Sequence, residues 1–245
     1  MSNNKRSRGP AAGDPTPEEH FSAQRALDIL DRLERAYPDH KPLLNYRNPY
    51  ELLIAVILSA QTTDAQVNLV TPALFAAFPD PCSLARAEQS TVEELIHSTG
   101  FFRAKARNVR AAARLLCEQF NSEVPDSMKA LVSLPGVGRK TANVLRGALF
   151  GLPAVIVDTH FARVTRRLGL AAASTADGVE REIAALIPPQ RQYSFSMRLN
   201  YHGRYRCHAR RPDCAGCEVR LLCPYPGGMN NAEAEDPVTK QSRVD

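Results

Sequence analysis

One lysine in this 245-residue chain follows a glycine-rich turn, within the segment LVSLPGVGRKTANVL (131–145). A lysine ammonium is no nucleophile near neutral pH, but burial or nearby positive charge favours the neutral, nucleophilic amine. Lys140 stands at the start of an expected helix and next to Arg139, so the helix dipole and the guanidinium both act in that direction. The position therefore suits a lysine that forms a Schiff base, and it would also suit a phosphate-binding lysine.

A second candidate for chemistry is Asp158, which precedes Thr-His-Phe at the expected start of another helix. Aspartate is a favoured helix N-cap, and capping alone would explain the residue type. Capping and catalysis are compatible, because a cap holds the carboxylate in one place.

The turn before Lys140 reads Leu134-Pro135-Gly136-Val137-Gly138. Pro135 ends the preceding helix, while Gly136 and Gly138 permit positive φ and the close approach of another backbone. The following helix begins with free N–H groups at its positive end, which is an anion site by geometry. We expect a DNA phosphate there, with Arg139 beside it; the alternative is an ordinary tight turn between helices.

Four of the six cysteines lie close together near the C-terminus in a C-x6-C-x2-C-x5-C pattern: Cys207, Cys214, Cys217 and Cys223. Iron–sulfur clusters and zinc both accept four cysteines. Zinc ribbons usually contain two C-x2-C pairs, and this pattern has one, so the spacing favours iron–sulfur and leaves zinc open. The other two, Cys82 and Cys117, are isolated in helical stretches and are expected to be small buried hydrophobic residues.

Basic residues gather around the first loop of this cysteine pattern: Arg204, Arg206, Arg210 and Arg211. Only Asp213 opposes them there, so we expect a phosphate clamp in which Arg210 and Arg211 contact DNA, the alternative being a solvated basic surface. A net charge of +5 agrees with a polyanionic partner but is weak support alone.

The hydrophobic content of 44% is normal for a soluble globular protein, and no apolar run approaches the length that spans a bilayer. No secretory signal begins the chain, so we expect an intracellular monomer that works with DNA and not with a membrane. Helical periodicity dominates, and 152–157 is expected to be an extended connector. A break is expected near Gln61–Asp64, with Thr63 or Asp64 as the next cap, and a capping box is expected at Ser90 or Thr91.

These patterns predict an all-α fold. Residues 1–19 and 227–245 are polar and are expected to be disordered tails.

Four stretches together, LPGVGRKTANVL, VDTH, ELLIAVILSAQTTD and GFFRAKARN, resemble the endonuclease III family of helix-hairpin-helix DNA glycosylases, and the resemblance covers nearly all of 21–226. It implies that Lys140 attacks C1′ of a damaged nucleotide and that Asp158 assists that attack and stabilises positive charge on the sugar. A Schiff base and β-elimination would then cut the strand 3′ to the lesion. It also implies a [4Fe–4S] cluster on the four cysteines. The fold it implies has two helical lobes flanking a DNA-binding cleft: one lobe is the bundle 42–152, which ends in the helix-hairpin-helix, and the other combines 20–41 with 153–226 and holds the cysteines.

The implied function is base excision repair of oxidised pyrimidines in double-stranded DNA. Gln61 matches a residue that fills the gap left by the extruded nucleotide, and Phe101 stands where the family usually has a leucine wedge. Phenylalanine can still stack between bases, although Phe101 and Phe102 could instead both pack in the core. The family's adenine glycosylases, which only remove the base, lack a lysine at the position of Lys140 and usually carry a further C-terminal domain. This sequence has the lysine and ends soon after Cys223, so the resemblance favours a bifunctional enzyme.

Two rival functions remain open from the sequence. One is a monofunctional or differently specific glycosylase, for example for uracil or mismatched bases. The other is a DNA-binding module without chemistry, which would have no use for Lys140 and Asp158.

Overall fold

The computed structural model describes residues 17–225, and within that range every regular element is helical. The all-helical expectation is thereby confirmed. The α-helices are α1 (Pro17–Ala36), α2 (Pro49–Leu58), α3 (Asp64–Ala77), α4 (Pro81–Arg86), α5 (Gln89–Ile96), α6 (Phe102–Gln119), α7 (Met128–Ser133), α8 (Arg139–Phe150), α9 (Thr159–Arg167), α10 (Ala176–Leu186) and α11 (Gln192–Tyr205). Three short 3-10 helices are found in the same range: η1 (His97–Thr99) between α5 and α6, η2 (Pro189–Arg191) before α11, and η3 (Arg220–Leu222) after α11.

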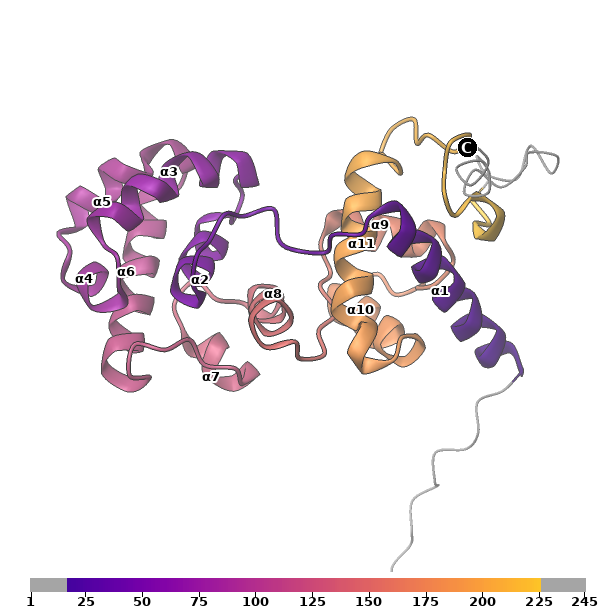
Figure 1. Cartoon of the computed structure of the whole chain (residues 1–245), viewed down its shortest axis with the longest axis horizontal. Coiled ribbons are helices and arrows are strands. Elements are labelled where there is room, and N and C mark those ends of the chain that lie inside the picture. The colour runs from indigo at the N-terminus through magenta and orange to yellow at the C-terminus, as the bar shows by residue number, and fades with distance from the viewer. Residues whose placement is uncertain (1–16, 226–245) are drawn as a thin grey trace, which may run out of the picture.

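Two hydrophobic cores organise these helices. The first lobe packs side chains of α2 to α8, and the second packs α1, α9, α10 and α11 with the loop that follows α11. In Figure 1, α2 to α7 lie on one side and α1, α9, α10 and α11 on the other, with α8 between them and the indigo segment after α1 crossing from one side to the other. Chain segments far apart in sequence, α1 and α9 to α11, therefore build a single lobe.

Helix α2 is the centre of the first lobe because its sequence is apolar apart from Glu51. All its residues after Pro49 are buried, which is the pattern of a helix surrounded by other helices. The side chain of Asn48 caps it by accepting from the amide of Glu51 at 2.9 Å. The chain leaves α2 at Ser59 and re-enters a helix at Asp64, where the Thr63 hydroxyl accepts from the amide of Gln66 at 3.2 Å. The expected break is confirmed, and of the two expected caps the structure uses Thr63.

Residues 152–157 form a non-helical connector between α8 and α9, as expected. Gly151 ends α8 with φ 61°, a left-handed conformation that glycine adopts without strain. Asp158 then caps α9 through Oδ1, which accepts from the amide of Phe161 at 2.7 Å. This connector thus carries the chain from the helix of Lys140 to the carboxylate of Asp158.

Two local predictions are wrong. Helix α5 begins at Gln89 after Glu88 and has no side-chain cap, so Ser90 and Thr91 form no capping box. The capping box lies one helix earlier, between Asp80 and Ser83 at the start of α4. A Ser-x-x-Glu spacing permits a box, but the path by which the chain enters the helix decides whether it forms. The tail expected for 1–19 also ends earlier, since α1 begins at Pro17; the rest of the expected tails, 1–16 and from 226 onwards, lies outside the described residues.

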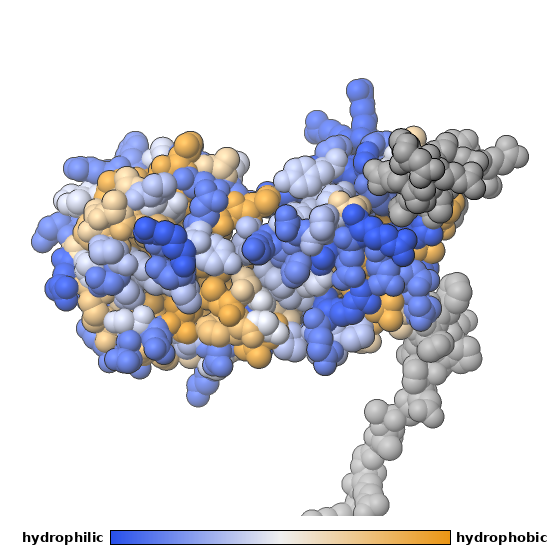
Figure 2. Space-filling model, in the orientation of Figure 1, coloured by the Kyte–Doolittle hydropathy of each residue, from blue (hydrophilic) through white to orange (hydrophobic). Residues whose placement is uncertain are grey.

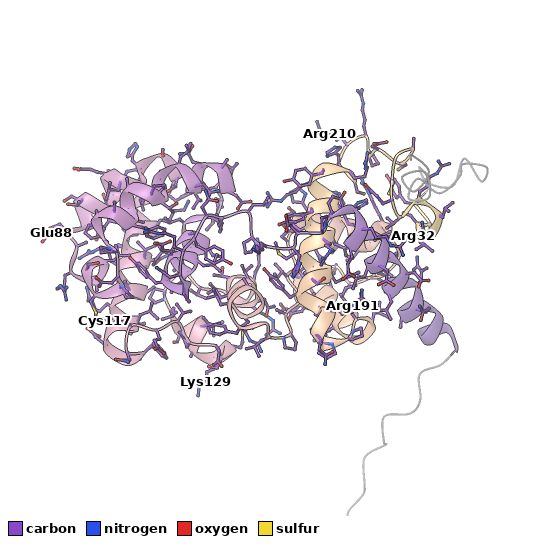
Figure 3. All side chains as sticks on the ribbon, in the orientation of Figure 1. Arg32, Glu88, Cys117, Lys129, Arg191 and Arg210 are labelled. Carbon is purple, nitrogen blue, oxygen red and sulfur yellow. A yellow bond between two sulfur atoms is a disulfide. The ribbon has the colours of Figure 1, made fainter. Side chains whose placement is uncertain are left out.

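Cys82 and Cys117 are not isolated hydrophobic residues. They form a disulfide that joins α4 to α6, with a Cα–Cα distance of 5.4 Å. Cys117 lies at the edge of the first lobe in Figure 3. The prediction failed because the two residues are 35 positions apart and only the packing of α4 against α6 brings them together.

The surface differs between the lobes. In Figure 2, hydrophilic side chains cover most of the visible face of the second lobe, whereas apolar patches interrupt the face of the first. No helix among residues 17–225 has the length and apolarity to cross a membrane.

Candidate functional site

A cavity of about 270 Å³ lies between the two lobes and contains both Lys140 and Asp158 on its walls. The first lobe contributes the end of α2, the start of α3 and α8, and the second contributes α11. The segment before α9 brings Asp158 to the same cavity. The two residues singled out from the sequence are therefore brought together by elements that belong to different parts of the chain.

Lys140 is the second residue of α8, and its side chain is exposed. No hydrogen bond or ion pair with another described residue engages its amine. Arg139 beside it is already paired, since its Nε and Nη2 lie 2.8 and 2.7 Å from the carboxylate of Glu180 on α10. That ion pair raises the pKa of Arg139 and offsets part of the positive charge that the sequence places near Lys140.

Asp158 is held at both carboxylate oxygens. Oδ1 accepts the capping hydrogen bond from the amide of Phe161, and Oδ2 accepts a hydrogen bond from the side-chain amide of Asn200 on α11. The Asn200 carbonyl in turn accepts from Nε of Arg204 at 2.8 Å, and Nη1 of Arg204 lies 2.9 Å from Asp64 at the start of α3. This chain of contacts links the carboxylate of the second lobe to the first lobe across the cavity.

Asn200 was missed by sequence reasoning. Its only signal was the spacing of Asn200 and Arg204, four residues apart on one helix, which places both side chains on the same face. Arg204 was expected in the phosphate clamp, and the structure instead places it on the cavity wall. Arg206 is likewise paired, with Asp213 and with Glu218 at 3.1 Å. Of the expected clamp, Arg210 and Arg211 remain exposed, and Figure 3 shows Arg210 at the outer edge of the second lobe.

The glycines of the hairpin serve different purposes. Gly136 has φ 82°, and a Cβ there would lie 2.8 Å from Ile57 Cγ2 and 3.2 Å from Asn108 Cβ. The turn therefore needs glycine for both its backbone conformation and its approach to α2 and α6. Gly138 is the N-cap of α8, and a Cβ there would meet nothing within 4 Å. The space beside Gly138 is therefore open, which leaves room for an anion near the start of α8.

Gln61 and Phe101 lie on two loops of the first lobe. Both side chains are exposed, Phe101 by 68%, so Phe101 does not pack in the core. Phe102 is half-buried and stacks on His97, with 4.4 Å between ring centroids. Both Gln61 and Phe101 have a left-handed φ, 54° and 49°, which is unusual for residues other than glycine.

The four C-terminal cysteines line a single small cavity of the second lobe as free thiols: Cys207, Cys214, Cys217 and Cys223. Burial raises the pKa of the Cys217 thiol to about 12, so a thiolate there needs a bound cation. Arg167 Nη1 lies 3.2 Å from Cys207 Sγ, and His202 Nε2 lies 3.6 Å from Cys217 Sγ. Four free thiols that line one cavity, with nitrogen donors near two of them, fit an anionic metal–thiolate centre.

A second group of three possible metal ligands shares Cys217 with these four cysteines. One ligand atom each of His202, Cys217 and Glu218 lies within 4.8 Å of the others. His202 also contacts Tyr37 and Glu218 through Nδ1, at 3.4 Å in each case, so its ring is anchored between packed neighbours.

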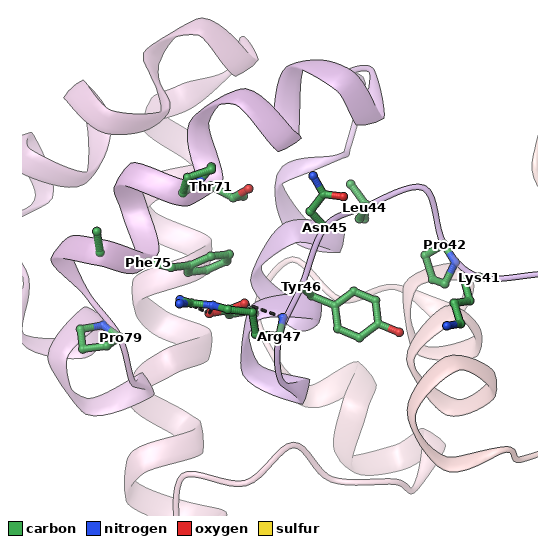
Figure 4. A pocket seen from close by; sticks show the side chains of 12 residues that line it. Lys41, Pro42, Leu44, Asn45, Tyr46, Arg47, Thr71, Phe75 and Pro79 are labelled. Carbon is green, nitrogen blue, oxygen red and sulfur yellow. Dashed lines mark hydrogen bonds and ion pairs between the residues drawn. The ribbon is translucent and has the colours of Figure 1, made fainter.

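A larger cavity, of about 980 Å³, lies elsewhere. It is in the first lobe, between the segment 41–47 and the second half of α3 (Figure 4). Among the charged residues that line it, the Arg47 guanidinium lies 2.6 Å from the buried carboxylate of Glu51, and Lys41 is the third. Neither Lys140 nor Asp158 lines it, so we place the site at the smaller cavity between the lobes.

The fold and the hairpin site agree with a known class. A family model described as "HhH-GPD superfamily base excision DNA repair protein" matches residues 54–189, and the chain belongs to this superfamily. The resemblance found in the sequence motifs is thereby confirmed.

Within that class the chain is similar to endonuclease III. It is 50% identical over 202 residues to endonuclease III of Synechocystis sp., covering 82% of this chain and 92% of the relative. It is 40% identical over 201 residues to endonuclease III of Escherichia coli K12, covering 82% and 95%. Two solved structures have a TM-score of 0.78 at 38% identity. One is a non-covalent endonuclease III–DNA complex, in which the aligned region covers 91% of this chain and 99% of the solved chain. The other is a trapped endonuclease III–DNA covalent intermediate, in which it covers 90% of this chain and 99% of the solved chain.

Proposed function

We propose that this chain is a bifunctional DNA glycosylase and AP lyase of base excision repair that removes oxidised pyrimidines from double-stranded DNA. The observation that carries the proposal is the cavity between the lobes, which is lined by both an unengaged Lys140 amine and a carboxylate held at both oxygens. A similar chain has been trapped in a covalent DNA intermediate, which agrees with a nucleophilic side chain.

In the proposed reaction the amine of Lys140 attacks C1′ of the damaged nucleotide, and the bond from C1′ to the base breaks. Asp158 accepts the proton that the amine loses and lies near the positive charge that develops on the sugar. The lysine–C1′ bond becomes an imine as the sugar ring opens. Loss of a proton from C2′ then expels the 3′-phosphate, which cuts the strand, and water releases Lys140.

The proposed DNA contacts follow from the exposed groups around the cavity. The amides at the start of α8, with Gly136 and Gly138 before them, would bind a phosphate, and Arg139 would add charge at its edge. Gln61 and Phe101 would enter the base stack when the nucleotide is extruded. In this arrangement the lobes 42–152 and 20–41 with 153–226 hold the DNA across the cavity mouth.

Borohydride trapping on a duplex containing one oxidised pyrimidine tests the proposal. The wild-type protein is expected to give a covalent protein–DNA band, because borohydride reduces the imine. Base loss without a band would indicate a monofunctional glycosylase. Neither base loss nor a band on any lesion would indicate a DNA-binding module.

Exchanging Arg210 and Arg211 for alanine is expected to weaken binding to all DNA sequences alike. Phosphate contacts carry no sequence information. Each contact removed makes the fall of log affinity with log salt concentration less steep by about 1. Filter-binding titrations at several salt concentrations measure both quantities. The matched control is Arg86→Ala with Arg114→Ala, which removes the same charge from exposed positions on α4 and α6. Equal effects of the two double variants would contradict a clamp.

We further propose that the four C-terminal cysteines hold a [4Fe–4S] cluster. The four free thiols that line one cavity support it, as does the family resemblance. Neither base removal nor β-elimination needs electron transfer, so the cluster would fix the shape of the loop after α11 and thereby the positions of Arg210 and Arg211.

The purified protein is expected to be brown and to absorb near ~400 nm, as thiolate-bound iron–sulfur centres do. Cys214→Ala is expected to lose this absorption. The pair Cys82→Ala and Cys117→Ala removes two cysteines outside the group and is expected to keep it. A colourless protein that contains zinc would contradict the cluster.

A further inference from the structure

Gln61 and Phe101 are exposed and have left-handed backbones, so the contacts that hold them in this conformation need an explanation. Such a backbone costs free energy in any residue other than glycine, and it persists only where the surroundings impose it. Burial of their side chains does not offset that cost, because both are exposed. The contacts that hold Gln61 and Phe101 in this conformation must therefore come from other residues of the two loops and from the residues on which these loops pack.

Those contacts converge on Lys105, in the first turn of α6. Its side chain is 4% exposed, and its ammonium donates to the Thr62 hydroxyl at 2.6 Å and to the Thr99 carbonyl at 2.8 Å. The Thr62 hydroxyl also donates to the Thr99 carbonyl. Thr62 directly follows Gln61, and Thr99 lies two residues before Phe101, so one buried ammonium joins both loops.

The ammonium is held by these loops alone. No carboxylate lies within ion-pair distance of it among residues 17–225, and burial lowers the pKa of Lys105. An uncompensated buried charge is costly unless its hydrogen bonds are satisfied, so the two loops and the lysine stabilise one another. The backbone amide of Lys105 also donates to the Phe101 carbonyl at 3.1 Å, and Gln66 reaches Ser98 at 2.7 Å on the surface.

We propose that Lys105 is a positioning residue that holds the loops of Gln61 and Phe101 as one rigid unit, so that both side chains enter a DNA duplex at a fixed separation. The inference rests on the proposed function, in which these two side chains enter the base stack. A rigid pair would lose little freedom on insertion, whereas loose loops would have to be ordered at each encounter.

The test compares two DNA substrates that carry the same abasic site. In the first substrate, base pairs flank the abasic site on both sides. In the second, the site lies in an unpaired bubble between duplex arms, so there is no base stack for the two side chains to enter. Lys105→Met, which keeps the apolar stem, is expected to slow single-turnover cleavage of the paired duplex by about ten- to a hundred-fold. The bubble is expected to be cleaved at nearly the wild-type rate.

Thr62→Val removes the hydroxyl of the same clamp and is expected to give the same pattern. The double variant is expected to be no worse than either single one, because residues that act as a unit are not additive. Lys129→Met, at an exposed position on α7, loses the same charge and is expected to cleave both substrates like the wild type. Thermal unfolding of each variant checks that it folds.

A second readout uses proteins that cannot react. In the Lys140→Gln background, 2-aminopurine placed opposite the lesion reports unstacking by its fluorescence, and adding Lys105→Met is expected to suppress that rise. Equal slowing on the bubble and the paired duplex, or unchanged unstacking, would overturn the inference. If the wild type cleaves neither substrate, the proposed function fails instead.

Discussion

Replacing Lys140 with glutamine is expected to abolish both strand cleavage and borohydride trapping. The amine is the one group on the cavity wall that the proposed reaction uses to form a bond to C1′, and glutamine cannot form an imine. Loss of a nucleophile lowers the rate by about a thousand-fold or more. Single-turnover cleavage and a trapping gel, run beside the wild type on one oxidised pyrimidine, measure the effect.

The variant is expected to fold normally and to bind the duplex, because Lys140 is exposed and engages no other described residue. Lys129→Gln makes the same change on α7 and is expected to leave trapping intact. If Lys140→Gln still gave a covalent band, another residue would be the nucleophile. If it weakened binding and cleavage to the same degree, Lys140 would be a phosphate contact.

Exchanging Asp158 for asparagine is expected to lower single-turnover base excision by about a hundred- to a thousand-fold, the effect of removing one electrostatic stabiliser from an active site. Asparagine caps helices as well as aspartate does, so α9 keeps its cap and the protein its stability. The negative charge facing the sugar is lost, together with the acceptor for the proton of Lys140. Excision rates and the thermal unfolding midpoint, measured together, separate charge from capping.

Asp80 provides the matched control for this substitution. It caps α4 in the same way, with Oδ1 accepting from the amide of Ser83 at 2.8 Å, and it lies outside the cavity. Asp80→Asn is expected to change neither excision nor stability. Asp158→Ala is expected to lose both activity and about 1 kcal/mol of stability, since it removes cap and charge. An active Asp158→Asn would reduce Asp158 to a structural cap.

The sequence by itself determined the all-α class and singled out the candidate residues for chemistry. Apolar patterning predicts helices along most of the chain, and a local rule predicts the cap at Asp158. Lys140 and the four cysteines could be singled out because a glycine hairpin and a cysteine spacing are patterns within one short stretch. The family resemblance then attached a chemistry to them.

Tertiary structure decided which groups meet. Asn200 binds Asp158 and Arg204 binds Asp64 only because α11 packs beside the cavity. Cys82 pairs with Cys117 because α4 packs on α6, and Arg139 pairs with Glu180 across two helices. Lys105 appears in the sequence as one more charge on a basic helix, yet it is buried and joins two loops. Periodicity records which face of a helix is apolar, whereas the partners of a polar side chain depend on how separate helices pack, and short-range patterns carry no record of that.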